Sequence, residues 1–265
     1  APALDPYNPL RDLLPLLAPV SKLRGDTRSG ILGFLDRYPF TIGVALTCVA
    51  LFVFAGYRSG GWPVDPDLRQ LLGANDSALL GSEPWRLLTS AFLHYEVWHF
   101  AFNLFAIVYW GRLFEVHFGS SRLWVLYCVS LLVASLCSAG WQEAAVALGV
   151  QDAGASSVGA SGAVFGLLFL CLITAQRAPG RFGTLLTQLR LWIGLSFLFA
   201  FFRSAPTDHA AHLGGAVSGI ALAYLFPPQP GEDLPPAWGA WAIALALAVV
   251  ASFARVLWTL RDVQL

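Results

Sequence analysis

Seven apolar segments dominate this sequence, each close to the roughly 20 residues that a helix needs to cross a bilayer. They run over 40–57, 93–115, 122–141, 157–175, 184–202, 209–226 and 238–258. Only 12% of the 265 residues are charged and 57% are hydrophobic, whereas a soluble domain carries about 25% charged residues. The sequence therefore predicts an all-α protein, a polytopic membrane helix bundle.

The basic residues are unevenly distributed over the segments between these spans. If the N-terminus is cytoplasmic, ten of the 16 lysine and arginine residues fall on the cytoplasmic side and six on the outer side. Because cytoplasmic loops carry the excess of Lys and Arg, this distribution favours a cytoplasmic N-terminus. The net charge is zero and no basic run occurs, so nucleic-acid binding is not expected.

The single Lys22 among many arginines, alanines and glycines indicates a GC-rich bacterial genome, so we expect an integral protein of the bacterial cytoplasmic (inner) membrane. The first long apolar stretch begins near Phe40, which is too deep for a cleavable signal. We expect three parts: a cytoplasmic N-terminal arm over 1–39, a six-helix core over 40–226, and a linker with the seventh transmembrane helix over 227–265.

Serine and histidine lie at the starts of alternate apolar segments. Polar side chains within a membrane are energetically unfavourable, so they commonly mark a functional site. With alternating spans, the second, fourth and sixth segments all begin at the same face, which the charge distribution makes the outer one. The polar groups at these starts should therefore lie at a similar depth, and they are His94, His99, Asn103, Ser161 and His212.

Ser161 is the candidate nucleophile and His212 its candidate general base, which together are the minimum for nucleophilic catalysis. Gly159 and Gly162 leave the serine hydroxyl unshielded. Free N–H groups at a helix N-terminus can hold a developing oxyanion. Phe165 follows Ser161 by one turn on the same helix face, so we expect its ring to pack against the imidazole.

His99 and Asn103 are four residues apart and therefore share one face of the second span. Both can donate hydrogen bonds, and with a helix N-terminus at Ser161 they would form an oxyanion hole. No acid obviously completes a triad, although Asp208, four residues before His212, is an open alternative for that role.

Five ordered motifs in this chain resemble those of the rhomboid intramembrane serine proteases, between about Trp85 and Tyr224. They are Trp85-Arg86, His94-x4-His99-x3-Asn103, Gly111-x3-Glu115-x3-Gly119, Gly159-x-Ser161-Gly162 and Ala211-His212-x2-Gly215-x3-Gly219. The resemblance implies a serine endopeptidase with a Ser161–His212 dyad and an oxyanion hole formed by His99, Asn103 and the Ser161 backbone N–H. It also implies that His94 supports the first loop.

The resemblance implies a six-helix rhomboid core, to which the seventh span is an addition. The substrates would be transmembrane proteins that unwind within the bilayer near their outer ends, with bulky residues such as Trp192 and Phe197 forming a lateral gate. Neither a cofactor nor a metal is implied. His209 departs from the asparagine that is common in relatives, and we expect it to tune hydrogen bonding near the site. Ser156 lacks a following glycine and ranks behind Ser161 as nucleophile.

Three alternatives stay open, and the oligomeric state is not predicted. The chain could be a catalytically silent, rhomboid-like protein that binds membrane clients. It could be a sorting protease for C-terminal membrane anchors. It could also be a metal transporter whose ligands are histidines, namely His94, His99, His209 and His212.

Overall fold

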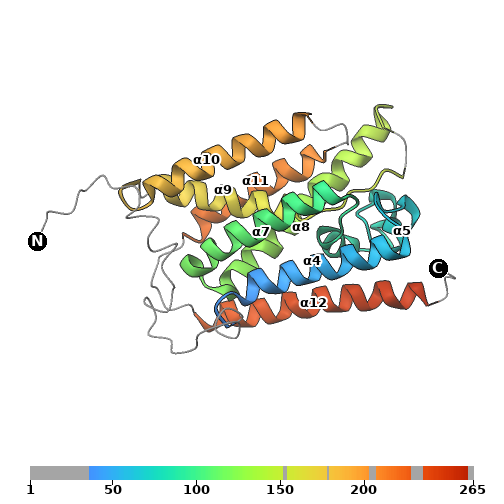
Figure 1. Ribbon diagram of the computed structural model, residues 1–265, viewed down its shortest axis with the longest axis horizontal. Helices are drawn as coiled ribbons and strands as arrows, with labels where there is room; N and C mark the ends of the chain where they lie inside the picture. The colour runs from blue at the N-terminus through green and yellow to red at the C-terminus, as the bar shows by residue number, and fades with distance from the viewer. Residues whose placement is uncertain (1–35, 152–153, 178, 203–206, 228–234, 262–265) are drawn as a thin grey trace, which may run out of the picture.

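The computed structural model describes residues 36–151, 154–177, 179–202, 207–227 and 235–261, and these form a helical bundle (Figure 1). Each predicted span corresponds to one long helix: α4 (Pro39–Arg58), α7 (Val97–Phe118), α8 (Ser120–Ala147), α9 (Ser161–Arg177), α10 (Pro179–Phe202), α11 (His209–Leu225) and α12 (Pro236–Leu260). The all-α fold class is confirmed. Most of the predicted N-terminal arm and of the linker after α11 lies outside the described residues.

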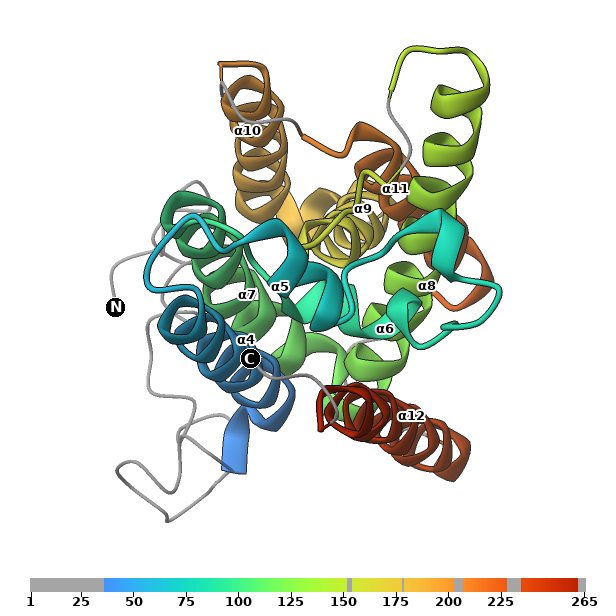
Figure 2. The ribbon, with the colours of Figure 1, turned by 90° about the vertical axis from the view of Figure 1, so that its right-hand side faces the viewer.

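The first loop, residues 59–96, contains the short elements α5 (Pro66–Leu71), η1 (Ser77–Leu79), α6 (Arg86–Thr89) and η2 (Ser90–Phe92) at one end of the bundle (Figure 2). Buried Arg86 holds them together. Its Nη1 donates to the carbonyl oxygens of Gln70 (2.7 Å) and Ala74 (2.9 Å), and its Nε donates to Glu83 (2.7 Å). Arg86 therefore fixes the shape of the loop.

Two helices begin later than the hydropathy pattern predicts. The chain is extended at Leu93, so α7 begins at Val97 and His94 precedes the helix instead of lying within it. Ser157 pairs with Asn75 in an antiparallel bridge, with both N···O distances 2.9 Å. Gly159 then adopts a φ of +128°, which a helix does not tolerate. As a result, Ser161 is the first residue of α9.

The described helices differ in their capacity to cross a membrane. α4, α8 and α12 are long and apolar enough to do so by length and composition. α9 and α11 have 17 residues each, which corresponds to about 25 Å and is shorter than a hydrocarbon layer of about 30 Å. If their C-terminal ends reach one face, their N-terminal ends lie within the layer.

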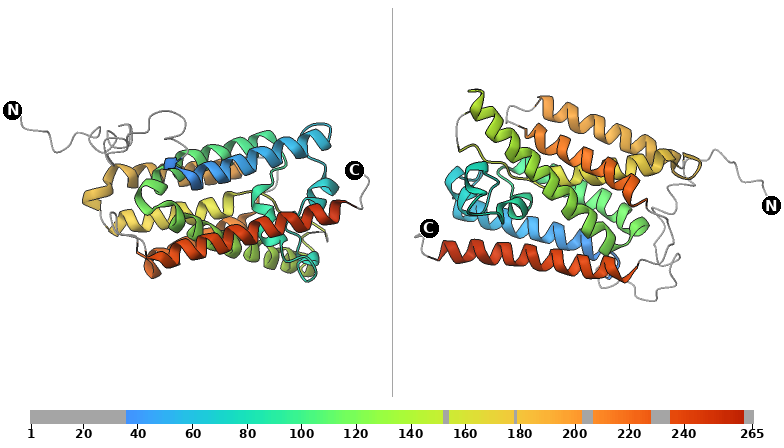
Figure 3. Two further views of the ribbon diagram at one scale, coloured as in Figure 1. Left: turned by 90° about the horizontal axis from the view of Figure 1, so that it is seen from below. Right: turned by 180° about the vertical axis from the view of Figure 1, so that it is seen from behind.

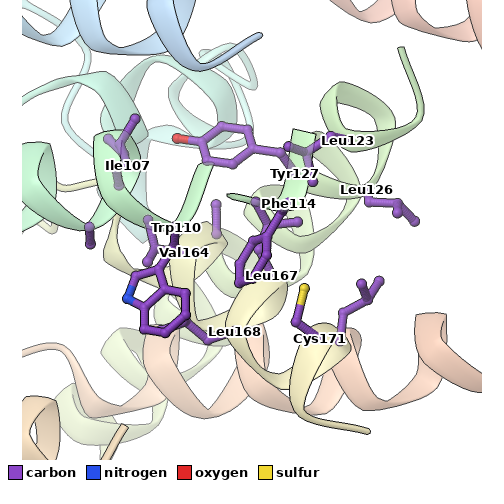
Figure 4. Packing of buried hydrophobic residues seen from close by; sticks show 14 of the residues in the cluster. Ile107, Trp110, Phe114, Leu123, Leu126, Tyr127, Val164, Leu167, Leu168 and Cys171 are labelled. Atoms are coloured by element: carbon purple, nitrogen blue, oxygen red, sulfur yellow. The ribbon is translucent and has the colours of Figure 1, made fainter. Parts of the chain in front are cut away.

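A hydrophobic core fills the space between α4, α7, α8 and α9, and its large members include Trp110, Phe114, Tyr127 and Leu168 (Figure 4). α10 contacts the bundle mainly through α9 and lies on the opposite side from α12 (Figures 2 and 3). α12, which the family resemblance implies is an addition to the six-helix core, therefore lies far from α10.

α12 packs against α8 and also against α5 and α6 of the first loop. The Arg255 guanidinium carbon lies 5.2 Å from the centroid of the Trp85 ring. Val256 and Leu260 join Leu68 and Leu72 in a small hydrophobic cluster beneath the loop. The seventh long helix therefore braces the first loop in addition to lining one side of the bundle.

Glu115, near the end of α7, holds the start of α4. Its carboxylate accepts hydrogen bonds from the backbone N–H groups of Phe40 (2.7 Å) and Thr41 (3.0 Å) and from the Thr41 hydroxyl (2.7 Å). The side chain is buried, and a negative charge at a helix N-terminus is favourable. Glu115 therefore anchors the start of α4 to the end of α7, whereas Asn103 lies near the start of α7.

We expect Glu115→Ala to lower the free energy of unfolding by about 3 kcal/mol, because three buried donors lose a charged acceptor. Glu115→Gln keeps one acceptor oxygen and should lose less. Thermal unfolding in detergent measures both. Glu143→Ala is the matched control, since Glu143 is exposed on α8. Equal midpoints for Glu115→Ala and the control would contradict this interpretation.

Candidate active site

Ser161 and His212 are brought together from α9 and α11. The Ser161 Oγ and the His212 Nε2 lie 2.8 Å apart, which is hydrogen-bonding distance. In the tautomer with Nε2 unprotonated, the imidazole accepts the serine proton. His212 is 8% exposed, whereas Ser161 is partly exposed in the wall of a cavity. The pair has the geometry of a nucleophile and its base.

Glycines determine how closely α9 and α11 approach. A Cβ at Gly215 would lie 1.9 Å from the carbonyl oxygen of Gly162, and one at Gly219 would lie 2.0 Å from that of Gly166. Two glycines on each helix, four residues apart, therefore allow backbone-to-backbone contact. This close packing holds the helix that carries Ser161 against the helix that carries His212.

The His212 imidazole is held by the ring of Phe165. The two rings are stacked, with centroids 4.4 Å apart and an interplanar angle of 9°. Phe165 in turn meets the edge of the Phe197 ring from α10 at a centroid distance of 5.5 Å. An aromatic stack on a buried imidazole restricts its rotation, so Nε2 stays directed at the serine hydroxyl.

Asp208 does not contact the imidazole of His212 as a third catalytic residue would. Its carboxylate caps α11, accepting from the Ala211 N–H at 2.8 Å, and also accepts from the Ser138 hydroxyl. The His212 Nδ1 atom is buried without a hydrogen-bond partner. Both oxygens of Asp208 are thus used for positioning the start of α11.

His99 lies against the segment that precedes Ser161. A Cβ at Gly159 would be 2.6 Å from the His99 Nε2 atom, so glycine is required there for space as well as for its positive φ. The Asn103 amide donates to the His99 carbonyl oxygen at 2.9 Å. An asparagine amide has two N–H donors, and this bond uses one of them.

One cavity of about 1220 Å³ contains these groups, and its lining includes Ser161, His212, His99 and Asn103. Ligand pockets of roughly 300–1,000 Å³ hold drug-sized molecules, so this cavity can hold an extended segment of several residues. The candidate nucleophile, base and hydrogen-bond donors therefore share a space large enough for a peptide.

Two further histidines lie near these groups. His209 is exposed in the lining, with its ring centroid 6.4 Å from that of His212. His94 is buried, and its ring lies 5.1 Å from that of His99. Ser156 also lines the cavity, but the hydrogen bond to His212 comes from Ser161. Within the described ranges, no three His, Cys, Asp or Glu side chains are arranged to hold a metal.

Ser138 and Gln142 of α8 were missed by the sequence reasoning. The Gln142 amide donates to the Asn75 carbonyl (3.1 Å) and to the Ser138 hydroxyl (3.2 Å), and its oxygen accepts from the Ser77 N–H (3.0 Å). Together they link the first loop to the Asp208 cap. Their signal in the sequence was two polar residues four apart at the end of an apolar span.

The chain is similar to proteins that are named as rhomboids. The chain is 28% identical to Rhomboid protease GlpG of Serratia proteamaculans (strain 568) over 188 residues, which cover 70% of this chain and 62% of that protein. It is 30% identical to RHOMBOID-like protein 6, mitochondrial, of Arabidopsis thaliana over 176 residues, which cover 60% of this chain and 50% of that protein. The chain thus spans less than two thirds of each relative.

The family match covers more than half of the chain. Residues 81–229 match the Rhomboid domain, from just before α6 to just beyond α11. This region contains the Ser161–His212 hydrogen bond and the α7 residues that share its cavity. Together with its apolar helices, the match makes the chain an integral membrane protein that belongs to the rhomboid family.

Proposed function

We propose that this protein is an intramembrane serine endopeptidase that hydrolyses peptide bonds in or near transmembrane segments of membrane proteins. The 2.8 Å hydrogen bond between Ser161 Oγ and His212 Nε2 carries the proposal. It lies in the wall of a peptide-sized cavity, and the N-terminus of α9 begins at the serine itself. The relative from Serratia is named as a rhomboid protease, which supports the same activity.

The reaction follows from the roles of the two residues. Ser161 Oγ attacks the substrate carbonyl carbon while its proton passes to His212 Nε2, forming a tetrahedral intermediate. His212 then donates that proton to the leaving amine as the C–N bond breaks, which leaves an acyl-enzyme on Ser161. A water molecule, deprotonated by His212, hydrolyses the ester and restores the hydroxyl.

The negative oxygen of the intermediate needs hydrogen-bond donors. We assign this role to the Ser161 backbone N–H, the Asn103 amide and the His99 imidazole, each of which belongs to a residue that lines the cavity. One such donor contributes about 3 kcal/mol of transition-state stabilisation. His94 is assigned a supporting role behind His99, and His209 a tuning role at the cavity mouth.

A transmembrane substrate must enter from the lipid and unwind, because an intact helix keeps its carbonyls hydrogen-bonded. We assign the entry route to the space between α7 and α10, where Phe105 and Trp192 stack with centroids 5.0 Å apart. Few other contacts connect these helices. Small or helix-breaking residues near the scissile bond would ease unwinding.

The orientation and location are part of the proposal. The excess of basic residues on one side supports a cytoplasmic N-terminus in a bacterial inner membrane, with the cavity towards the outer face. We divide the chain into an arm over 1–39, a protease core over 40–226 and an added segment over 227–265. The contacts between α12 and the first loop support a bracing role for that last part.

A fluorophosphonate probe tests the nucleophile directly. We expect it to label the purified protein at Ser161, as located by peptide mass spectrometry, because an activated serine forms a stable adduct with phosphorus. Ser161→Ala should remove the label and the cleavage of a model transmembrane substrate. Ser156→Ala is the matched control and should keep both.

Labelling at Ser156, or cleavage by Ser161→Ala, would refute the assignment of the nucleophile. If the folded protein binds membrane proteins but neither reacts with the probe nor cleaves the model substrate, it is instead a catalytically silent relative. The same experiment therefore separates the enzyme from the client-binding alternative.

A further inference from the structure

Arg69 is a cation in the wall of the cavity that contains Ser161 and His212. It lies on α5, next to Leu68, which is buried beneath the first loop. The backbone on both sides is fixed: the Arg69 N–H donates to the Asp65 carbonyl, and the Arg69 carbonyl accepts from Ala74 N–H, each at 3.0 Å. The place of this side chain in the cavity wall is therefore built into the loop.

The Tyr95 ring connects Arg69 with His99, one of the proposed oxyanion-binding groups. Its guanidinium carbon lies 5.6 Å from the centroid of the Tyr95 ring. The Tyr95 ring centroid lies 5.1 Å from that of His99, and His99 lies against Gly159. Arg69 is therefore on the His99 side of the cavity, and the Tyr95 ring lies between it and the His99 imidazole.

The charge of Arg69 is incompletely compensated. Its Nε atom is buried without a hydrogen-bond partner. Partial burial lowers the pKa of the guanidinium from its ordinary value, while the neighbouring Asp65 and Tyr95 oppose this shift. Arginine keeps its charge under such conditions. A partly desolvated cation with a free donor is unfavourable, and a bound anion would remove that cost.

The carboxylates on this side of the site each cap a helix. Asp65 caps α5, its Oδ1 accepting from the N–H groups of Asp67 and Leu68. Asp208, the only carboxylate among the described residues that line the cavity, caps α11 and accepts from Ser138. Among the described residues that line the cavity, a substrate therefore meets one arginine, on the His99 side, and one carboxylate, Asp208, whose two oxygens already accept hydrogen bonds.

We propose that Arg69 binds the carboxylate of an acidic side chain in the substrate, within a few residues of the scissile bond, and so selects among substrates. The inference rests on the proposed protease function. A planar guanidinium can hold a carboxylate through two parallel hydrogen bonds, which a neutral amide in the substrate cannot match. Arg69 is thus a specificity-determining residue of the first loop.

The test uses a model transmembrane substrate in which aspartate is moved through each position flanking the scissile bond, with asparagine at the same position as the matched substrate. At one position we expect kcat/KM for aspartate to exceed that for asparagine by about tenfold. Arg69→Gln should bring this ratio close to one, and Arg69→Glu should make lysine the preferred residue there. Because each ratio compares two substrates of one enzyme, partial misfolding cancels.

Arg190→Gln is the matched control, because it removes the same charge from an exposed position on α10 outside the cavity. The control should keep the aspartate preference. Cleavage is measured in phosphatidylcholine vesicles with and without phosphatidylglycerol. If Arg69 affects the preference for aspartate only when phosphatidylglycerol is present, the anion bound by Arg69 is a lipid headgroup. That result would overturn the proposal.

The inference is refuted if aspartate and asparagine substrates are cleaved with equal kcat/KM at every position. It is also refuted if Arg69→Gln leaves the aspartate-to-asparagine ratio unchanged. Neither result would refute the proposed protease function. Absence of cleavage for every substrate, together with absence of fluorophosphonate labelling at Ser161, would refute the proposed protease function and this inference with it.

Discussion

His212→Ala should lower kcat/KM for a model transmembrane substrate by about 10⁴-fold or more, because the general base is lost while the fold is kept. The imidazole is the only group seen hydrogen-bonded to the Ser161 hydroxyl in the described structure. Without it, the serine keeps its proton at neutral pH and attacks slowly. Initial rates at several substrate concentrations measure the loss, and circular dichroism checks the helix content.

Asp208→Asn is the matched comparison, and its outcome decides between a dyad and a triad. An asparagine oxygen can still accept from the Ala211 N–H, so the α11 cap is kept. We expect a loss of less than about tenfold, whereas removing the charge of a true triad acid costs about 10⁴-fold. A loss comparable with that of His212→Ala would show that Asp208 acts on the imidazole, contrary to the contacts seen here.

The long helices and their order could be predicted from the sequence because hydropathy is a local property. Each apolar segment has the length that a bilayer demands, and each became one helix. The starts of α7 and α9 were wrong by four residues because they depend on distant contacts. The bridge between Asn75 and Ser157 holds the segment before α9 in an extended conformation. No local sequence pattern predicts a pairing between residues separated by 82 positions.

The parts of the candidate site differ in the same way. Ser161, His212, His99 and Asn103 could be selected because polar side chains stand out in apolar spans. Arg69 could not, since a charged residue in a polar loop is ordinary. Its place in the cavity wall depends on the folding of the first loop, which Arg86 controls through hydrogen bonds to the carbonyls of distant residues.

Gly215→Ala should separate α9 from α11 and abolish most of the proposed protease activity. The new Cβ would lie 1.9 Å from the Gly162 carbonyl oxygen, which is backbone and cannot rotate away. Overpacking of this kind costs about 1–3 kcal/mol, and a displacement of roughly 1 Å at reacting groups can cost about 10²-fold in rate. Gly219→Ala should act similarly, since its Cβ would lie 2.0 Å from the Gly166 carbonyl oxygen.

Gly140→Ala on α8 is the matched control, because a Cβ there meets nothing within 4 Å. In a helix interior this change removes backbone freedom and should stabilise by about 0.5–1 kcal/mol. Thermal unfolding and cleavage are measured for all three variants. If Gly215→Ala cleaves like Gly140→Ala, the α9–α11 contact does not set the distance between Ser161 and His212. If Gly215→Ala stays folded but loses labelling by the fluorophosphonate probe, the glycine contact positions the nucleophile and its base as well as stabilising the bundle.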